Sequence, residues 1–305
     1  MNRQRDLRGL RLGIALAVVS AIFFATNTPL SKVVYASGQG AMAVIVARAA
    51  CALTLCTLIC VLSRQPLVSG LDIRGAGLLA LFMFGQGAMY IGSVKFISVT
   101  LAAILFFTWP LLIGLSAVSN QSATGRAVSI ACFLVAFVGL VLAFGLDISV
   151  IDRRGVALAI CGSFCMAGYV LCAQRFTSKS TRPLGLNIQI NLGIVLLGVV
   201  TMLIFDGFPN AVGFDEKFVY AIAALSIFYT VATVTQLVAI KYGGAAPTAI
   251  AFNLEPVASI LLAVAFLGDT LSFQIMLGGL LVISSLIVYS TLALRCEKPE
   301  VTRSQ

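Results

Sequence analysis

The sequence contains no histidine, and this absence excludes several common chemistries. Ser-His-Asp triads, histidine zinc sites and histidine proton relays all need an imidazole. Charged residues make up only 10% of the chain, whereas a soluble domain has about 25%. The chain also lacks a Gly-rich loop ending in Gly-Lys-Ser or Gly-Lys-Thr, so it carries no nucleotide-binding module for an ATP-driven pump. We expect neither a metal site nor a cofactor.

Apolar residues are abundant instead, at 60% of 305 residues. They form ten runs of helical length, whereas strands of a membrane barrel would be about 10 residues long with alternating polarity. The eight cysteines contain no Cys-x-x-Cys pair and are expected to be small packing residues. We therefore predict an all-α integral membrane protein. The expected spans are 12–36, 41–62, 75–95, 99–119, 127–146, 155–175, 186–206, 217–241, 246–268 and 272–294.

The net charge of +9 comes from basic residues at the ends of the apolar runs, where they act as topology signals rather than as a nucleic-acid surface. With the N-terminus placed in the cytoplasm, 14 of the 20 Lys and Arg residues lie at inner ends and 5 at outer ends, with Arg48 inside a span. This asymmetry predicts a multi-pass plasma-membrane protein with both termini in the cytoplasm.

Residues 95–118 recur 146 positions later, at 241–264. Eight of the 24 aligned positions are identical, including Lys95 with Lys241 and Pro110 with Pro256, whereas apolar composition alone would give about two or three identities. Each copy would hold five spans, an odd number, so the second copy would cross the membrane in the opposite sense. We predict two inverted five-helix repeats, residues 1–148 and 149–305, the second ending in a short cytoplasmic tail.

Two opposite charges lie at similar depth in the predicted bundle. Glu255 is about nine residues into its span and Arg48 about seven, which places both near the middle of a hydrocarbon layer about 30 Å thick. Charges at this depth usually mark a functional site. Glu255 is either a proton site or counter-charge for a substrate amino group, or a structural carboxylate that neutralises Arg48. Arg48 correspondingly either holds a substrate carboxylate or forms a packing contact or salt bridge.

Pro110 and Pro256 occupy equivalent places in the two copies and predict kinks that bend two spans around a cavity and serve as gating points. Trp109, the only tryptophan, is either a cavity aromatic or a packing residue. Uncharged polar residues inside spans must face the bundle or water, so they either line a cavity or form hydrogen bonds between helices. These candidates are Asn27, Gln86, Tyr90, Tyr169, Tyr229, Gln236 and Asn253.

A series of residues spread along the chain carries a family resemblance. It comprises Asn27, Lys32, Arg48, Tyr90, Lys95, Pro110, Glu255-Pro256, Gly268-Asp269 and Gly278-Gly279. Over about residues 10–295 the chain resembles a ten-helix member of the drug/metabolite transporter superfamily, of the EamA type. It departs from the family pattern at Gly268-Asp269, where Gly-Glu is frequent, and at Phe24-Ala25-Thr26, where an aromatic-Gly pair commonly precedes the asparagine. The departures weaken any transfer of substrate identity.

The resemblance implies export of small metabolites, amino acids or drug-like solutes through a central cavity lined by spans 1, 3, 4, 6, 8 and 9. We therefore expect a secondary exporter working by alternating access. Its partners would be the lipid bilayer, a small-molecule substrate and, as a candidate coupling ion, the proton; no nucleic acid is expected, and the chain would be a monomer or weak dimer. A facilitative uniporter or exchanger, a passive channel and, least favoured, a membrane-embedded enzyme are the alternatives.

Overall fold

The computed structural model describes residues 2–27, 30–31, 34, 40–117, 123–145, 152–177, 181–206, 216–267 and 272–296. Lys32 and Gly268-Asp269, which carry part of the family resemblance, lie outside these ranges. The described residues form helices and no strand. The helices are α1 (Asn2–Ala25), α3 (Ala41–Leu62), α4 (Ile73–Ser93), α5 (Val99–Phe106), α6 (Trp109–Ala117), α7 (Ala123–Phe144), α8 (Arg153–Phe176), α9 (Pro183–Thr201) followed by the π-helical turn η2 (Met202–Asp206), α10 (Glu216–Gly243), α11 (Ala245–Phe252), α12 (Leu254–Leu267) and α13 (Phe273–Cys296).

Within the described residues, ten segments are long and apolar enough to cross a membrane. The predicted fold class is confirmed: the chain is an all-α integral membrane protein with ten transmembrane helices. Large apolar side chains on the outside of the bundle, such as Leu58, Leu280 and Ile287, are about half exposed, as expected of helices whose outer surfaces meet lipid. The boundaries differ most in the first span, predicted as 12–36, because α1 begins at Asn2 and ends at Ala25. The arginines that precede the apolar run are good helix formers and extend the helix.

The fourth and ninth spans, predicted as single helices, are each broken in two near the predicted kinks. The first break separates α5 from α6, and the second separates α11 from α12. A proline has no N–H to donate to the carbonyl four residues earlier. For Pro110 that carbonyl belongs to Phe106, and for Pro256 it belongs to Phe252; these are the last residues of α5 and α11. The breaks therefore follow directly from the prolines.

Polar side chains cover the carbonyls at both breaks. The Oγ1 of Thr108 donates to the carbonyl of Leu105 (2.7 Å) and lies 2.8 Å from the Oγ of Ser163 on α8. At the second break, the Nδ2 of Asn253 lies 3.3 Å from the carbonyl oxygen of Ile250, to which it donates. Backbone groups exposed by a break inside a bilayer need such partners, because lipid offers none. Both breaks are thus stabilised from within the protein.

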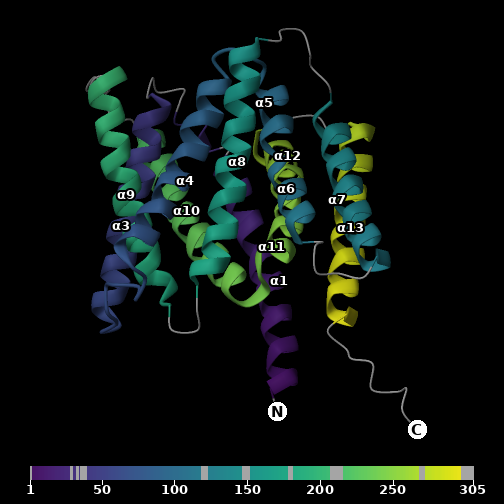
Figure 1. Ribbon diagram of the computed structural model, residues 1–305. Coiled ribbons are helices and arrows are strands. Elements are labelled where there is room, and N and C mark those ends of the chain that lie inside the picture. The colour runs from purple at the N-terminus through teal and green to yellow at the C-terminus, as the bar shows by residue number, and fades with distance from the viewer. Residues whose placement is uncertain are drawn as a thin grey trace.

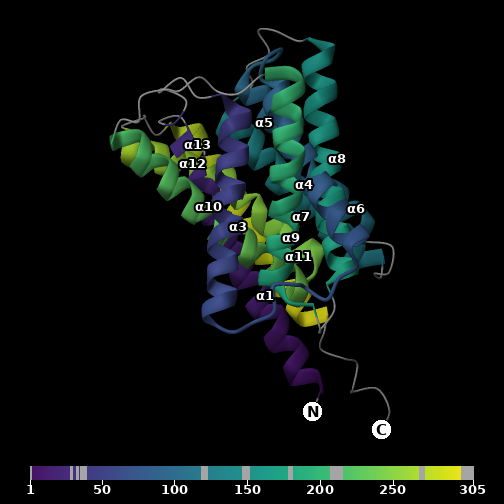
Figure 2. The ribbon, with the colours of Figure 1, turned by 90° about the vertical axis from the view of Figure 1, so that its left-hand side faces the viewer.

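The helices pack in pairs (Figures 1 and 2). α1 contacts α10, and α4 contacts α8; α7 contacts α13, and α3 contacts α9. Contacts of one half have counterparts in the other at the offset of 146 residues: α1 with α11 corresponds to α8 with α5, and α4 with α9 corresponds to α10 with α3. The inverted relationship of two repeats, 1–148 and 149–305, stays a prediction. We call the end where α1 begins and α13 ends the terminal face, and the other end the opposite face (Figure 1).

Glycines allow two of these pairs to approach at backbone distance. A Cβ at Gly139 of α7 would lie 2.6 Å from the carbonyl oxygen of Gly278 on α13. A Cβ at Gly13 of α1 would collide with the backbone of Gly243 on α10. Lipid offers no hydrophobic driving force between helices, so close packing of this kind is a main source of association in membranes.

Replacing Gly278 by alanine is expected to destabilise the protein, because the new methyl group would collide with the carbonyl of Gly139. Overpacking of this kind costs about 1–3 kcal/mol. Thermal unfolding in detergent measures the effect, and the expected result is a midpoint several degrees lower (about 1 kcal/mol shifts the midpoint by roughly 2–4 °C in a chain of this size). The matched control is Gly77→Ala on α4, where a Cβ meets nothing within 4 Å. Equal stability of the two variants would contradict the packing argument.

Candidate functional site

A cavity of about 600 Å³ lies inside the bundle and is the candidate functional site. It is lined by residues from α1 and the segment after it, α3, α4 and the turn after it, α5, α6, α8, α10, α11 and α12. The lining includes both charges that the sequence placed at mid-depth, Arg48 and Glu255. Apart from α3, which contributes Arg48, the helices are those of the spans that the family resemblance implied.

The mouth of the cavity is at the opposite face. Ser31, Ala41, Lys95 and Val99 line this end, and they belong to chain segments that lie far from the terminal face (Figure 1). Lys95 is exposed, and Val99 is 58% exposed. The described conformation is therefore open toward the opposite face.

Four aromatic rings from different helices meet at the inner part of the cavity, and we call them the aromatic floor: Phe24, Trp109, Tyr229 and Phe252. The ring of Phe24 lies 5.7 Å from that of Phe252 and 6.1 Å from that of Tyr229, and Trp109 lies 5.8 Å from Phe252. These are edge-on or tilted arrangements, which aromatic quadrupoles favour. Trp109 and Phe252 adjoin the two helix breaks, so the broken backbone places these rings in the wall.

Lys95 lies at the mouth of the cavity, and the two charged groups further inside belong to α3 and α12. The guanidinium of Arg48 lies 4.6 Å from the ring centre of Tyr229, within the range of a cation–π contact. Glu255 lies in the first turn of α12, where the amino-terminal end of a helix dipole favours a negative charge. The two groups line the same cavity and interact electrostatically. Among the described residues, however, no hydrogen bond or ion pair joins Arg48 to Glu255.

Two polar atoms of the cavity residues are buried with no hydrogen-bond partner among the described residues. One is the Nε of Arg48, a donor, and the other is the Oδ1 of Asn27, an acceptor. The Nδ2 of Asn27 donates to the carbonyl of Phe24 (2.9 Å), which orients the side chain and leaves its oxygen unused. Inside its mouth, where Lys95 lies, the cavity thus combines apolar rings with an unused donor, an unused acceptor and one charge of each sign.

Seven residues selected from the sequence line this cavity. They are Asn27, Arg48, Gln86, Tyr90, Trp109, Tyr229 and Glu255. Their elements differ widely in sequence position, and only packing brings them together. The ring of Tyr90 also lies 5.0 Å from that of Phe106, another cavity residue.

The structure places the remaining candidates outside the cavity wall. Asn253 is 2% exposed and bonds to carbonyls of its own break, so its amide is occupied structurally. Tyr169 is 1% exposed within the main hydrophobic core. Gln236 is fully buried. Pro110 and Pro256 do not line the cavity, although the residue before each of them does. The structural effect of each proline is the helix break.

Sequence reasoning missed most of the apolar part of the wall, such as Phe24, Met83, Phe106 and Met166. In a water-soluble protein, an amphipathic pattern would separate inward from outward positions. Here both sides of each helix are apolar, so that signal is weak. The offset of 146 offered one clue, since Phe106 and Phe252 are identical at equivalent positions.

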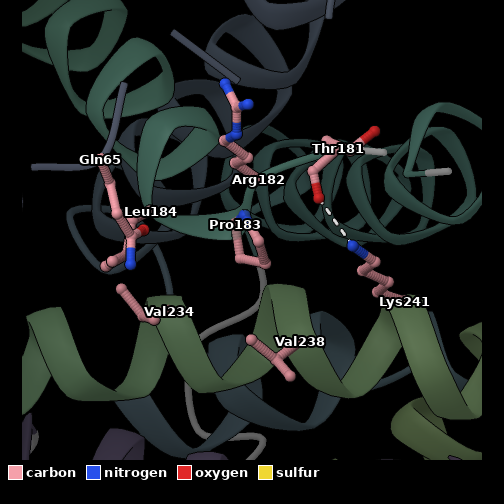
Figure 3. Close-up of a pocket in the computed structure, with 8 residues that line it drawn as sticks. All are labelled: Gln65, Thr181, Arg182, Pro183, Leu184, Val234, Val238 and Lys241. Carbon is pink, nitrogen blue, oxygen red and sulfur yellow. Dashed lines mark hydrogen bonds between the residues drawn. The ribbon is translucent and has the colours of Figure 1, made fainter. Parts of the chain in front are cut away.

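A second hollow of about 560 Å³ lies near the terminal face, between the start of α9 and the end of α10 (Figure 3). The Nζ of Lys241 donates to the carbonyl of Thr181 (2.7 Å), and the side chain of Arg182 extends away from α10. Its polar groups do not converge on one point, and none of the candidates selected from the sequence lines it. The first cavity is therefore the better candidate site.

Replacing Tyr229 by leucine is expected to lower the thermal stability in detergent, because Arg48 loses the ring beneath its guanidinium. A cation–π contact shielded from water contributes about 2 kcal/mol. Tyr229→Phe keeps the ring and should stay close to the parent protein. Tyr220→Leu on the same helix is the matched control, since Tyr220 is 70% exposed. If Tyr229→Leu unfolded at the same temperature as Tyr220→Leu, the contact would contribute nothing.

Comparisons with known proteins agree with this architecture. Twenty-nine chains of solved structures match. One, described only as "Crystal structure of protein", superposes with a TM-score of 0.81 and 18% sequence identity, over 92% of this chain and 98% of that chain; this likeness concerns the fold alone. No curated protein matches. Residues 153–291 match the model of the EamA-like transporter family. Over its second half the chain is therefore similar to the EamA-like transporters of the drug/metabolite transporter superfamily, which points to a membrane transporter of that type, and its ten apolar spans make it a multi-pass membrane protein.

Proposed function

We propose that the protein is a secondary transporter for small zwitterions with an apolar side chain, such as amino acids or similar drug-like solutes. The observation that carries the proposal is the presence of Arg48 and Glu255 in one aromatic cavity without a direct ion pair between them. Opposite charges that merely neutralise each other in a bundle would be expected in direct contact. Charges held apart are available to a ligand that carries both signs.

The remaining features of the cavity suit the same ligand. A carboxylate can accept from the guanidinium of Arg48, whose Nε is unused, in the charge-assisted geometry that arginine favours. An ammonium group can donate to Glu255 and to the unused Oδ1 of Asn27. The aromatic floor offers an apolar surface for the side chain. A volume of about 600 Å³ lies within the usual range of small-molecule pockets, about 300–1,000 Å³.

Alternating access is the proposed mechanism. The cavity opens toward the opposite face, while the aromatic floor and the helix contacts beneath it close the path to the terminal face. The paired contacts of the two halves support two inverted repeats that rock about the central site. The breaks before Pro110 and Pro256 are the proposed gating points, since short half-helices can reorient at an interruption.

The proposed direction is export across the plasma membrane. The distribution of basic residues supports a cytoplasmic terminal face. In that orientation the described conformation is open to the exterior. Substrate would enter from the cytoplasm after the floor opens and would leave through the mouth near Lys95.

Glu255 is the proposed proton-coupling residue, because no other acidic residue in the described part of the chain lines the cavity. Protonation would neutralise the carboxylate after the substrate's amino group departs and would permit the return step. Facilitative exchange without protons is the second candidate, favoured by the electrostatic interaction with Arg48, which can balance Glu255 by itself. A channel would need polar groups along its whole axis, and the aromatic floor interrupts such a path.

Glu255→Gln is expected to abolish transport driven by a proton gradient while leaving the amount of folded protein unchanged, because glutamine keeps the shape but cannot carry the proton. Uptake of aromatic or aliphatic amino acids into proteoliposomes, with and without an imposed pH difference, measures this effect. Transport should respond to the imposed pH difference only in the parent protein. The expected loss of gradient-driven transport is at least tenfold.

Glu216→Gln is the matched control, because Glu216 begins α10 and is exposed outside the cavity. It should transport at the parental rate. Full gradient-driven transport by Glu255→Gln at normal abundance would refute the coupling role. Absence of saturable counterflow for every zwitterion tested would refute the substrate class.

A further inference from the structure

Gln236 on α10 is in an unfavourable environment for an amide. The residue is fully buried, and neither its Nε2 nor its Oε1 has a hydrogen-bond partner among the described residues. An unsatisfied polar group costs free energy when it is buried away from water. An apolar residue of the same shape would be at least as stable there. The structure alone therefore gives no stabilising reason for this glutamine.

The position of Gln236 relates it to the transport path. It follows Tyr229 of the aromatic floor by seven residues, or two helical turns of about 10.5 Å in total, and so lies on the same side of α10. α10 runs toward the terminal face, where it ends at Gly243. Gln236 therefore lies beyond the floor, on its terminal side. A different side of α10, with Val234, Val238 and Lys241, lines the second hollow (Figure 3).

α1 covers this stretch of α10. The Oγ of Ser20 donates to the carbonyl of Ala232 (2.7 Å). Closer to the terminal face, the backbones of Gly13 on α1 and Gly243 on α10 are in contact. Gln236 lies between these two contact points on α10, and the fully buried Ala17 lies between them on α1. We call this stretch the terminal seam. It closes the path from the aromatic floor to the terminal face in the described conformation.

Thr233, a neighbouring polar residue on α10, has hydrogen-bond partners, whereas Gln236 has none among the described residues. Thr233 accepts from the Nδ2 of Asn187 (2.8 Å) and donates to the carbonyl of Thr230 (3.1 Å). Its hydroxyl is satisfied, whereas the amide one turn away is not. The Oδ1 of Asn191 and the Oγ of Ser226 are also buried without a partner, but among the described residues Gln236 alone lacks a partner at both of its polar atoms.

We propose that Gln236 is a substrate-binding residue of the conformation that is open to the terminal face. This inference rests on the proposed function, which supplies the substrate class and the alternation between two openings. When α1 separates from α10 at the seam, the amide faces the path and can donate to a carboxylate while accepting from an ammonium group. Its hydrogen bonds are made in that conformation and are missing in the described one.

The first test replaces Gln236 by methionine, which has a similar shape and no amide. The thermal midpoint should stay equal or rise, because an unsatisfied group is removed, while zwitterion counterflow should fall about three- to tenfold, the equivalent of one hydrogen bond. The matched control is Gln189→Met. The Oε1 of Gln189 accepts from the Oγ of Ser69 (2.5 Å), so this variant should lose stability and transport normally per folded molecule.

Two outcomes of this test would overturn the inference. One is counterflow by Gln236→Met at the parental rate. The other is a midpoint lowered as in Gln189→Met, which would assign the glutamine a structural role.

The second test does not depend on the substrate. Gln236→Cys is introduced into a variant whose native cysteines are replaced by alanine, and a membrane-impermeant maleimide is applied to each side of oriented vesicles. Labelling is expected from the terminal face only, whereas Lys95→Cys at the cavity mouth should be labelled from the opposite face. No labelling of position 236 from the terminal face, with Lys95→Cys labelled, would overturn the inference. Labelling without counterflow in the parent protein would instead show that the proposed substrate class is wrong.

Discussion

Hydrocarbon cannot satisfy the hydrogen bonds of a peptide backbone, and the centre of this protein follows from that constraint. Two prolines remove donors in the middle of two spans, and the helices end at the carbonyls that lose their partners, those of Phe106 and Phe252. Interrupted backbone is tolerated only where protein surrounds it, so both breaks lie in the bundle and not at its lipid surface. The cavity forms beside them, and Trp109 and Glu255 enter its wall from the half-helices that start there.

The electrostatics of the cavity depend on the same enclosure. Arg48 lies over the ring of Tyr229 and Glu255 lies in the first turn of α12, so each charge has a partial partner that is not the other charge. A ring quadrupole and a helix dipole are weaker partners than a salt bridge. They stabilise each charge without occupying all of its hydrogen-bonding groups, which the proposed substrate would use.

Hydrogen-bond satisfaction, more than burial, distinguishes the polar residues that serve the backbone from those that we propose to bind substrate. Asn253 and Thr108 are both engaged with carbonyls at the helix breaks, and their polar atoms serve the backbone. Asn27, Arg48 and Gln236 are buried to different degrees, yet each keeps an unused polar atom next to the cavity or the terminal seam. In a bundle surrounded by lipid, such atoms point to a ligand or to a second conformation.

The sequence by itself determined the ten apolar spans, the two interruptions and the mid-depth of Arg48 and Glu255, because hydrophobic length, missing proline donors and helical rise are local properties. It also singled out nearly all polar residues of the cavity wall, but with them Asn253, Tyr169 and Gln236, which lie elsewhere. Only the tertiary structure decided which polar groups share the cavity, which bond to the backbone and which lie beyond the floor. The physical reason is that helices in lipid are apolar on every side, so the inward direction of a side chain is set by packing between distant segments and not by a periodic pattern.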